Sequence, residues 1–504
     1  MKSPEPSNSS SNGVKHLRMR LVEILRLTGA VEMGEKEQLY QERLKRYLTA
    51  MRNEKPDCIP IRPFVAEFTA KYAGYTCQEV THDYRKAFEA VLKCARDFDW
   101  DAMVANMVYV WTGLTQALGL KYYAIPGVDI PPNTAFQYLE PPEEKAFMKP
   151  NEYNLLIDDP TAFLYNVWLP RVSSDTGGEA SGCQYRSRLA LVKGAMAMSE
   201  YFNAFGPQVE RMRREAGTVS AIAGILKAPL DIIADKLRGY VGLAKDLHRQ
   251  PEKVLEACEA LAPHLAEVAR MTADPEKKVP IGFWMHRTSI PFISMNHFKN
   301  IHWRTLKPII EELWSHGHRV LFYAEGDWTP HLDSFAELPE GSIVFHIDRS
   351  DVSETHGKLG RRFCLSGGLP NWLLTIGTPD EVRRYCKKII DTVASDGGYI
   401  MDASAIIQND AQVENVKAMT DFTRNYGKYE RGSGGLEHSS RGKVFSNPEA
   451  TLKKPRVKPG SCIPWDEKRK EIAEISGDEG LLKRVWEEID SLGYLFIWQV
   501  LLSF

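Results

Sequence analysis

Short apolar runs alternate with amphipathic segments between Ile281 and Tyr426, and this alternation restricts the fold more than any other feature of the sequence. One run and one amphipathic segment together take up roughly 30 residues, which is the length of a βα unit in a parallel sheet. Strands of a parallel sheet are buried on both faces and therefore read as continuous apolar runs. The predicted strands are residues 281–286, 320–325, 342–348, 362–367 and 398–404.

The clearest helix signal in this region begins at Thr378. Thr378, Pro379 and Glu381 match an N-cap, a first-turn proline and the acid of a capping box. The apolar residues that follow recur on one face of a helix up to Val393. The sequence therefore predicts an amphipathic helix that covers the sheet.

Two earlier segments, residues 101–111 and 120–127, read as the front of the same sheet, which supplies enough units for eight strands. The predicted fold is a (βα)8 TIM barrel over residues 54–430. Residues 174–270 are rich in Gly and Ser at first and then mostly helical, which predicts an insertion or lid within the barrel. A tail and two N-terminal helices are expected in residues 1–53, and a linker with a short helical appendage in residues 431–504.

The balance of charge argues against nucleic acid as a partner. Lys and Arg number 64 against 66 Asp and Glu, so the net charge of -2 provides no field for a polyanion. The eight cysteines form no CxxC pair, as is usual for reduced thiols. The polar first residues and the lack of an apolar stretch of about 18 residues favour a cytoplasmic protein.

The C-terminus, Ser491 to Phe504, is almost wholly apolar. It is too short to span a bilayer. The sequence predicts a terminal helix docked on the body or on a second subunit, which leaves a homodimer open. Contact with one face of a membrane is the alternative.

Polar residues follow the predicted strands at their carboxyl ends. In a barrel or doubly wound sheet the loops at these ends converge on one mouth, where chemistry takes place. Alternation along the strand places Tyr323 and Glu325 on one face, with Gly326 turning the chain before Asp327. The same alternation pairs Trp284 with His286, His346 with Asp348, Asp402 with Ser404, and Cys364 with Ser366.

Glu325 is the strongest candidate, because a carboxylate between a buried strand and a glycine must be paired, hydrogen-bonded or ligating to offset its desolvation. One hypothesis is a zinc site made of Glu325, His346 and Cys364, which are common ligand types for this ion. The other is a general acid/base pair of Glu325 with His286 or His346. Each residue has a structural alternative: a helix cap for Asp327, a hydrogen-bonded core histidine for His346, and a small buried hydrophobe for Cys364.

Four aromatic residues are candidates for an apolar wall around a ring-bearing substrate: Trp111, Trp284, Tyr323 and Trp328. Core packing is the alternative role for each.

Several segments occur in an order that is more specific than any one of them: PIRPFVAEFTAKYAGYT, DWDAMVANMVYVWTGLTQALG, LRGYVGLAKDLHRQPEKV, HRTSIPFIS, VLFYAEGDWTPHLD, FCLSGGLPNWLLTIGTPDEVRRYCKKIID, GGYIMDAS and ENVKAMTDF. In this order they resemble the uroporphyrinogen decarboxylase superfamily, a (βα)8 barrel group that also contains corrinoid-dependent and coenzyme M methyltransferases. The resemblance covers Asp57 to Lys428.

The chain departs from both branches at the positions that matter. Where decarboxylases carry an arginine-rich RQAGRY-type segment and an early aspartate, this sequence has AEFTAKYAG and a strand without an acid after Asp101. Where the methyltransferases carry His-x-Cys and a late cysteine for zinc, it has Tyr323-Ala324-Glu325 and Asp402-Ala403-Ser404. Neither porphyrinogen decarboxylation nor the thiol-activating zinc site is therefore expected.

The resemblance implies a variant methyltransferase that moves a methyl group between a small organic substrate and a separate corrinoid (cobalamin) protein, with zinc assistance left open. Glu325, His286, Asp327 and Tyr323 are the expected catalytic residues, and Trp111, Trp284, Trp328, Arg287 and Asp402 the expected substrate contacts. One alternative is a decarboxylase or lyase that holds a non-porphyrin acid with Arg287 or Arg62. The other is a non-catalytic partner protein that keeps the barrel.

Overall fold

The computed structural model describes residues 34–107, 111–177, 184–429 and 452–502. The predicted tail and the first predicted N-terminal helix lie outside these residues. Residues 34–51 are helical, and the buried side chains of Leu44, Tyr47 and Met51 join the core cluster formed by inward-facing strand residues. The Tyr47 hydroxyl donates to the Ala221 carbonyl at 2.9 Å.

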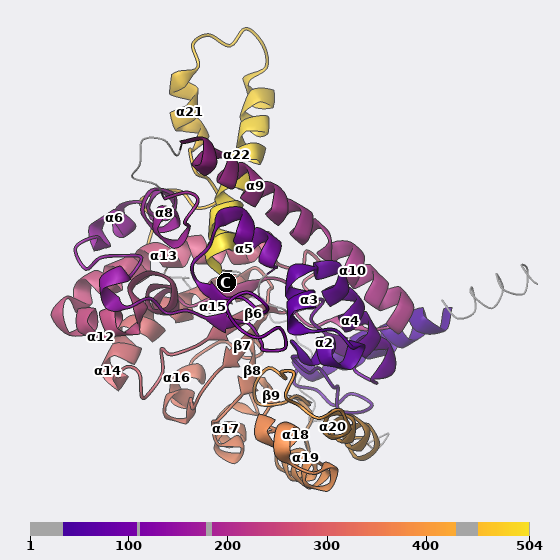
Figure 1. Ribbon diagram of the computed structural model, residues 1–504. Helices are drawn as coiled ribbons and strands as arrows, with labels where there is room; N and C mark the ends of the chain where they lie inside the picture. Colours follow the sequence, from indigo (N-terminus) through magenta and orange to yellow (C-terminus); the bar gives the residue numbers. More distant parts are fainter. Residues whose placement is uncertain (1–33, 108–110, 178–183, 430–451, 503–504) are drawn as a thin grey trace, which may run out of the picture.

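All five strands predicted between residues 281 and 404 are present, in one six-stranded parallel sheet of order β10-β9-β8-β7-β6-β5. Figure 1 shows these strands at the centre of the molecule with helices around them. The strands of this sheet are β5 Ile225–Lys227, β6 Ile281–Met285, β7 Val320–Ala324, β8 Ile343–Ile347, β9 Cys364–Gly367 and β10 Tyr399–Ile400.

Backbone hydrogen bonds extend the sheet beyond both edges. At the β10 edge, Met401 N–H donates to the Pro60 carbonyl, and Arg62 N–H donates to the Met401 carbonyl. Ile61 in turn accepts from Asp101 N–H, directly before β1 Ala102–Met103. β1 pairs in parallel with β4 Val219–Ser220, and β5 follows β4 five residues along the chain. The parallel α/β architecture is therefore confirmed.

Strand alternation separates two packed layers, as the pattern predicts. Phe322 of β7 and Phe345 of β8 belong to the cluster beneath the outer helices, whereas Leu321, Tyr323 and Val344 belong to the inner cluster. The inner face therefore carries Trp284, Tyr323, His346 and Cys364, the faces expected from the sequence.

The helix predicted at Thr378 is confirmed as α19 Pro379–Val393, with both hydrogen bonds of the capping box present. The helices before the six-stranded sheet are α2 Phe68–Ala73, α3 Cys77–His82, α4 Tyr84–Asp97, α5 Thr112–Leu118, η1 Glu143–Lys145, α6 Tyr153–Asp158, α7 Pro160–Phe163, η2 Leu164–Trp168, α8 Leu169–Val172, α9 Gln184–Asn203, α10 Phe205–Arg211 and η3 Met212–Ala216. Those that follow β5 are α11 Pro229–Ile232, η4 Ile233–Arg238, α12 Gly239–Arg249, α13 Pro251–Thr272, α14 Met295–His297, η5 Phe298–Trp303, α15 Arg304–Ser315, η6 Thr329–His331, α16 Leu332–Phe335, α17 Val352–Leu359, α18 Asn371–Ile376, α20 Val413–Tyr426, α21 Trp465–Glu471 and α22 Glu479–Leu502.

Two sequence interpretations of the early part of the barrel were wrong. Residues 120–127 do not join the main sheet, because β2 Tyr123–Ala124 pairs antiparallel with β3 Gln137–Tyr138 in a separate hairpin. Residues 174–270 are not wholly an insertion, because they contain β4 and β5 of the parallel sheet. The segment 218–227 was missed because small residues interrupt its apolar run. The outer boundaries expected at residues 53 and 431 remain predictions.

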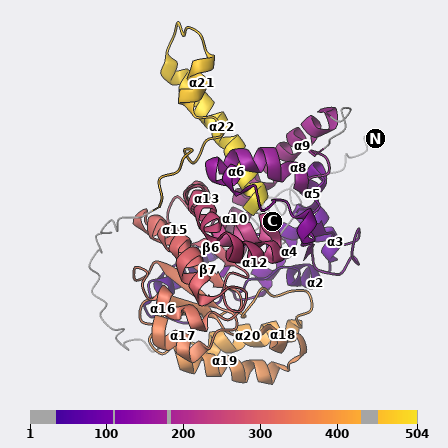
Figure 2. The same cartoon turned by 90° about the vertical axis from the view of Figure 1, so that its left-hand side faces the viewer.

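The apolar C-terminus is the second half of α22 and packs on the body. Trp498 stacks on His264 with ring centroids 5.3 Å apart, and its indole N–H donates to Thr161. The first half of α22 projects away from the body together with α21, as Figures 1 and 2 show. Within the described ranges, every helix is too short or too polar to cross a membrane.

Candidate active site

The carboxyl ends of β5, β6 and β7 bring together a charged cluster around Asp235. One oxygen, Asp235 Oδ2, lies 2.5 Å from Lys227 Nζ and 2.8 Å from His286 Nδ1. The other accepts from the Tyr240 hydroxyl at 2.5 Å. Burial alone would raise the pKa of Asp235, but the charges of Lys227 and His286 outweigh it and hold the pKa well below the usual range. Asp235 is therefore an anion that orients the imidazole of His286.

A second buried acid, Asp231, is hydrogen-bonded to the backbone of the same histidine. Its carboxylate accepts from the backbone N–H of His286 at 3.3 Å and from the hydroxyl of Thr288 at 2.8 Å. Burial, together with the nearby charge of Asp235, raises its pKa to about 7. The two acids, four residues apart, therefore differ in charge, since their surroundings move their pKa values in opposite directions.

His286 Nε2 faces the carboxylate of Glu325, 4.0 Å away. The structure therefore places these two residues near each other, but the desolvation argument made for Glu325 was wrong. The Glu325 side chain is 52% exposed, so it is not a desolvated carboxylate that must be ligated. Gly326 adopts a φ of 97°, and its N–H donates to Asp348 Oδ2, which turns the chain and leaves Glu325 on the rim.

The β2–β3 hairpin covers one side of this cluster. The rings of Tyr138 and His286 lie 6.3 Å apart. The buried Lys236 Nζ lies 4.1 Å from the ring centroid of Tyr122 and 5.2 Å from that of Tyr138. Arg287, predicted as a substrate contact, is half exposed on the same side and lies 3.6 Å from Glu140. The cluster thus has a hydrophobic wall and a charged, accessible rim.

An aromatic layer lies inside the strands and contains two of the predicted site residues. Tyr323 stacks on His346 with centroids 4.4 Å apart and lies the same distance from Trp284. Phe64 contacts Trp284 edge to face at 5.0 Å. Tyr323 and Trp284 are both buried, so their predicted roles in catalysis and substrate contact are corrected to packing.

Asp402 is also buried in the interior, where it pairs with Arg62. Arg62 Nη2 lies 3.6 Å from Asp402 Oδ2, and both side chains are fully buried. The guanidinium stacks on Phe64 at 4.1 Å from the ring centroid. Burial raises the pKa of Asp402 to about 7, although Arg62 opposes this. Asp402 is therefore not a substrate contact, and Arg62 is not placed to hold a substrate acid.

The predicted zinc ligands are not brought together. His346 Nε2 lies 2.9 Å from the Ser404 carbonyl, which can only accept, so Nε2 carries the proton and Nδ1 accepts from Ser366 at 3.0 Å. Burial raises the pKa of the Cys364 thiol to about 12 and keeps it neutral. Among the described residues, no group of three or more His, Cys, Asp or Glu side chains is placed to hold a metal ion. The donor set predicted from the sequence therefore does not fit zinc.

The surroundings of three further residues, Trp111, Trp328 and Asp327, correct the roles predicted for them. Trp111 lies among outer helices, where its indole donates to His82 and its ring meets Tyr84 at 5.0 Å. Trp328 is fully buried between the sheet and its outer helices, and its indole N–H donates to the Glu325 carbonyl. Asp327 is exposed and accepts from Thr329 N–H at 2.9 Å, in a local turn before η6 and not as its N-cap. None of the three lies beside His286.

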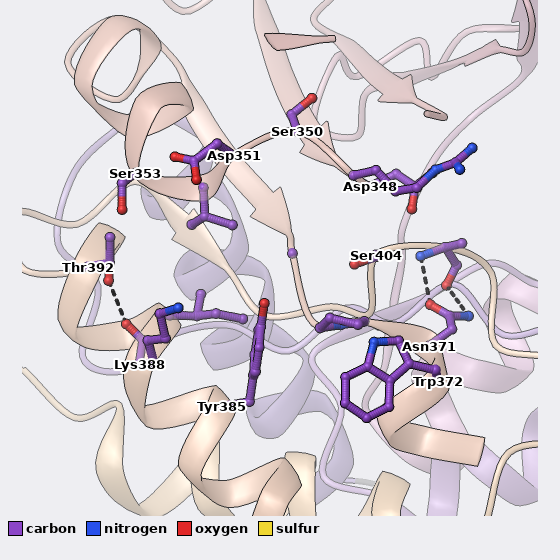
Figure 3. A pocket seen from close by; sticks show the side chains of 16 residues that line it. Asp348, Ser350, Asp351, Ser353, Asn371, Trp372, Tyr385, Lys388, Thr392 and Ser404 are labelled. Carbon is purple, nitrogen blue, oxygen red and sulfur yellow. Dashed lines mark hydrogen bonds and ion pairs between the residues drawn. The ribbon is translucent and has the colours of Figure 1, made fainter. Parts of the chain in front are cut away.

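A cavity of about 550 Å³ lies between the ends of β8 and β9 and helices α17, α18 and α19 (Figure 3). Its lining mixes acids (Asp348, Asp351), bases (Arg349, Lys388) and the rings of Trp372 and Tyr385. Burial raises the pKa of Asp348 to about 6. His286, Glu325 and the other residues of the charged cluster do not line this cavity.

The functional residues that the sequence analysis missed are Lys227, Asp231, Asp235 and Tyr240. They lie in the segment 227–240, which was interpreted as part of an insertion. A usable signal was present: two acids four residues apart, Asp231 and Asp235, in a mostly apolar segment that directly follows an apolar run. Asp235 also lies in the π-helical turn η4, a distortion that is frequent at functional sites.

The buried acid Glu67 is expected to make the stability of the protein depend on pH. The side chain is buried, and burial raises its pKa to about 7. A folded-state pKa above the unfolded value means that stability is present at low pH and is lost as the pH rises from about 4.5 to 7. Glu67→Gln removes this dependence, so the wild type loses on the order of 3 kcal/mol relative to the variant over this range. Urea unfolding at several pH values measures it, and parallel stability curves for the two proteins contradict it.

These observations first define a class: an α/β protein with a parallel sheet and an acid–base cluster at its strand ends. The sequence model of the family described as Uroporphyrinogen decarboxylase (URO-D) matches residues 192–426. These residues therefore match the uroporphyrinogen decarboxylase family, as the order of the motifs predicted.

A solved structure, a methyltransferase from Methanosarcina mazei, is similar to this chain with a TM-score of 0.51 and 14% sequence identity. The similarity covers 76% of this chain and 98% of that one, and at this identity it shows a shared fold. Together with the family it implies a TIM barrel. The comparison with curated proteins gives no match.

Proposed function

We propose that the protein is a methyltransferase that moves a methyl group between a small organic substrate and a corrinoid carried by a separate protein. The observation that carries this proposal is the Asp235–His286 pair, which presents a positioned imidazole beside Glu325 at the strand ends. The superfamily and the name of the structural neighbour support the reaction class.

Removal of a methyl group from a heteroatom is helped by a proton on that heteroatom. When a methyl group leaves a heteroatom, the electrons of the broken bond stay on that heteroatom, which becomes a better leaving group if it takes a proton. His286 Nε2 is the donor, and Asp235 fixes the orientation of the ring through Nδ1. In the opposite direction, His286 takes the proton of the acceptor. The corrinoid would supply a cobalt centre that takes the methyl group when reduced and gives it when methylated.

The surroundings of His286 suit a large partner on one side and a small substrate on the other. Arg287, Phe292 and Glu325 are exposed on the rim. The hairpin rings and Trp284 limit the inner space. Because the described residues offer no zinc ligand set, no step of the proposal depends on zinc.

The proposed barrel closes through the backbone bonds at the sheet edges. We infer that residues 59–62, β1 and the continuous segment β4–β5 complete a ring of eight parallel strands with β6 to β10. The bonds from Met401 to Pro60 and from Asp101 to Ile61 support this ring. In a closed ring the loops after β5, β6 and β7 converge on one mouth, which is where the Asp235–His286 pair lies.

The direct test is to mix the purified protein with reduced cobalamin and a panel of methylated amines, thiols and phenols. Conversion of the cobalt(I) spectrum to that of methylcobalt(III) with one donor class is the expected result. Absence of methyl transfer with every class, together with release of CO2 from a small acid, would establish the decarboxylase alternative instead.

A further inference from the structure

Two exposed apolar stripes have the same spacing on different helices. On the projecting half of α22, Leu482, Val485, Ile489 and Leu492 follow one another at steps of three, four and three residues and are 40–66% exposed. On α9, Tyr185, Leu189, Val192 and Met196 follow at steps of four, three and four and are 38–78% exposed. Such alternation of three and four is the seam of a helix that packs against another helix.

The stripes also match in length. Each runs over 10 or 11 residue steps, which at 1.5 Å per residue is about 15–17 Å. The α22 stripe continues into the half of the helix that packs on the body, so its base is fixed by buried Tyr494 and Trp498. In Figures 1 and 2 the α21–α22 hairpin projects freely, so its stripe is presented to a partner.

The charges around the two stripes are opposite. Residues 465–492, which hold α21 and the projecting part of α22, contain nine acidic and five basic residues. Helix α9 contains three basic residues, Arg186, Arg188 and Lys193, of which Arg186 pairs with Asp175, and one acid, Glu200, which pairs with Arg85. Pairing of α22 with a second α22 would place acids against acids, whereas pairing of α22 with α9 places acids beside bases.

We propose that the protein forms a dimer in which the α22 stripe of each copy packs on the α9 stripe of the other. A two-fold axis then gives two identical contacts and leaves no stripe uncovered. The same acidic surroundings oppose binding of this stripe to an anionic membrane surface. This proposal is independent of the reaction, because neither stripe contains a residue of the charged cluster.

Sedimentation equilibrium of the full chain tests it. The wild type is expected to be dimeric, and Val485→Glu or Met196→Glu should each weaken association at least tenfold, because each places a charge in the seam. Lys483→Glu changes charge on the opposite face of α22 and serves as the matched control with an unchanged mass. All three positions are exposed, and circular dichroism confirms folding.

Mixing the two variants separates this arrangement from its alternatives. A mixture of Val485→Glu and Met196→Glu chains retains one intact α22–α9 contact, so dimers should partly reappear in the mixture and in neither variant alone. Dissociation by Val485→Glu but not by Met196→Glu would indicate α22–α22 pairing and overturn the proposal. A wild type that stays monomeric at all concentrations, or that binds vesicles through α22, also overturns it.

Discussion

Replacing His286 with glutamine lowers the rate of methyl transfer by about 10²–10⁴-fold, the usual contribution of a positioned acid or base. The amide cannot deliver a proton from the position of Nε2, while its size keeps the packing at the end of β6. Rates of methylcobalt formation measure the effect. His316→Gln, on the exposed end of an outer helix, is the control and should leave the rate unchanged.

Substitutions of Asp235 and Glu325, the two acids near His286, should change the rate of methyl transfer in different ways. Asp235→Asn removes the negative charge 2.8 Å from Nδ1 that orients the ring, so the rate should fall. Glu325→Gln should cost less than about tenfold, because exposed ion pairs contribute about 1 kcal/mol or less. Full turnover in His286→Gln would remove this residue from the mechanism.

The second large effect is on stability and concerns the buried pair in the interior. At a pH well above 7, where Asp402 is ionised, Asp402→Asn leaves the charge of Arg62 fully buried without its partner, which should lower the free energy of unfolding by about 3–5 kcal/mol. Arg62→Met should cost less, because Asp402 can take a proton at neutral pH whereas a guanidinium cannot lose one.

The double variant Arg62→Met/Asp402→Asn tests whether the unpaired charge causes the loss of stability in Asp402→Asn. It has no buried charge and keeps an oxygen that can accept from Phe64 N–H at the position of Asp402 Oδ1. It should therefore be more stable than Asp402→Asn alone. Urea unfolding with equal slopes gives the three values. A double variant less stable than the single one would show that the pair stabilises the fold through more than charge neutralisation.

The candidate site was predicted only in part, and Glu325 shows why. Alternation along β7 placed it correctly at the inner edge and near His286, because side-chain direction is a local property of a strand. The predicted burial of Glu325 was wrong, because the exposure of its side chain depends on the loop that turns at Gly326 and on the residues that cover that loop. Trp328 failed in the opposite sense: it follows a strand end in the sequence, yet it packs between sheet and helices.

The sequence by itself determined the parallel α/β fold, the five late strands, the capped helix α19 and the superfamily. Hydrophobic period and capping chemistry act over a few neighbouring residues, so one chain is enough to read them. Only the tertiary structure decided that Asp235 holds His286, and that Asp402 pairs with Arg62. These contacts join residues 51 and 340 positions apart, and their charges depend on burial and on neighbours that the fold supplies.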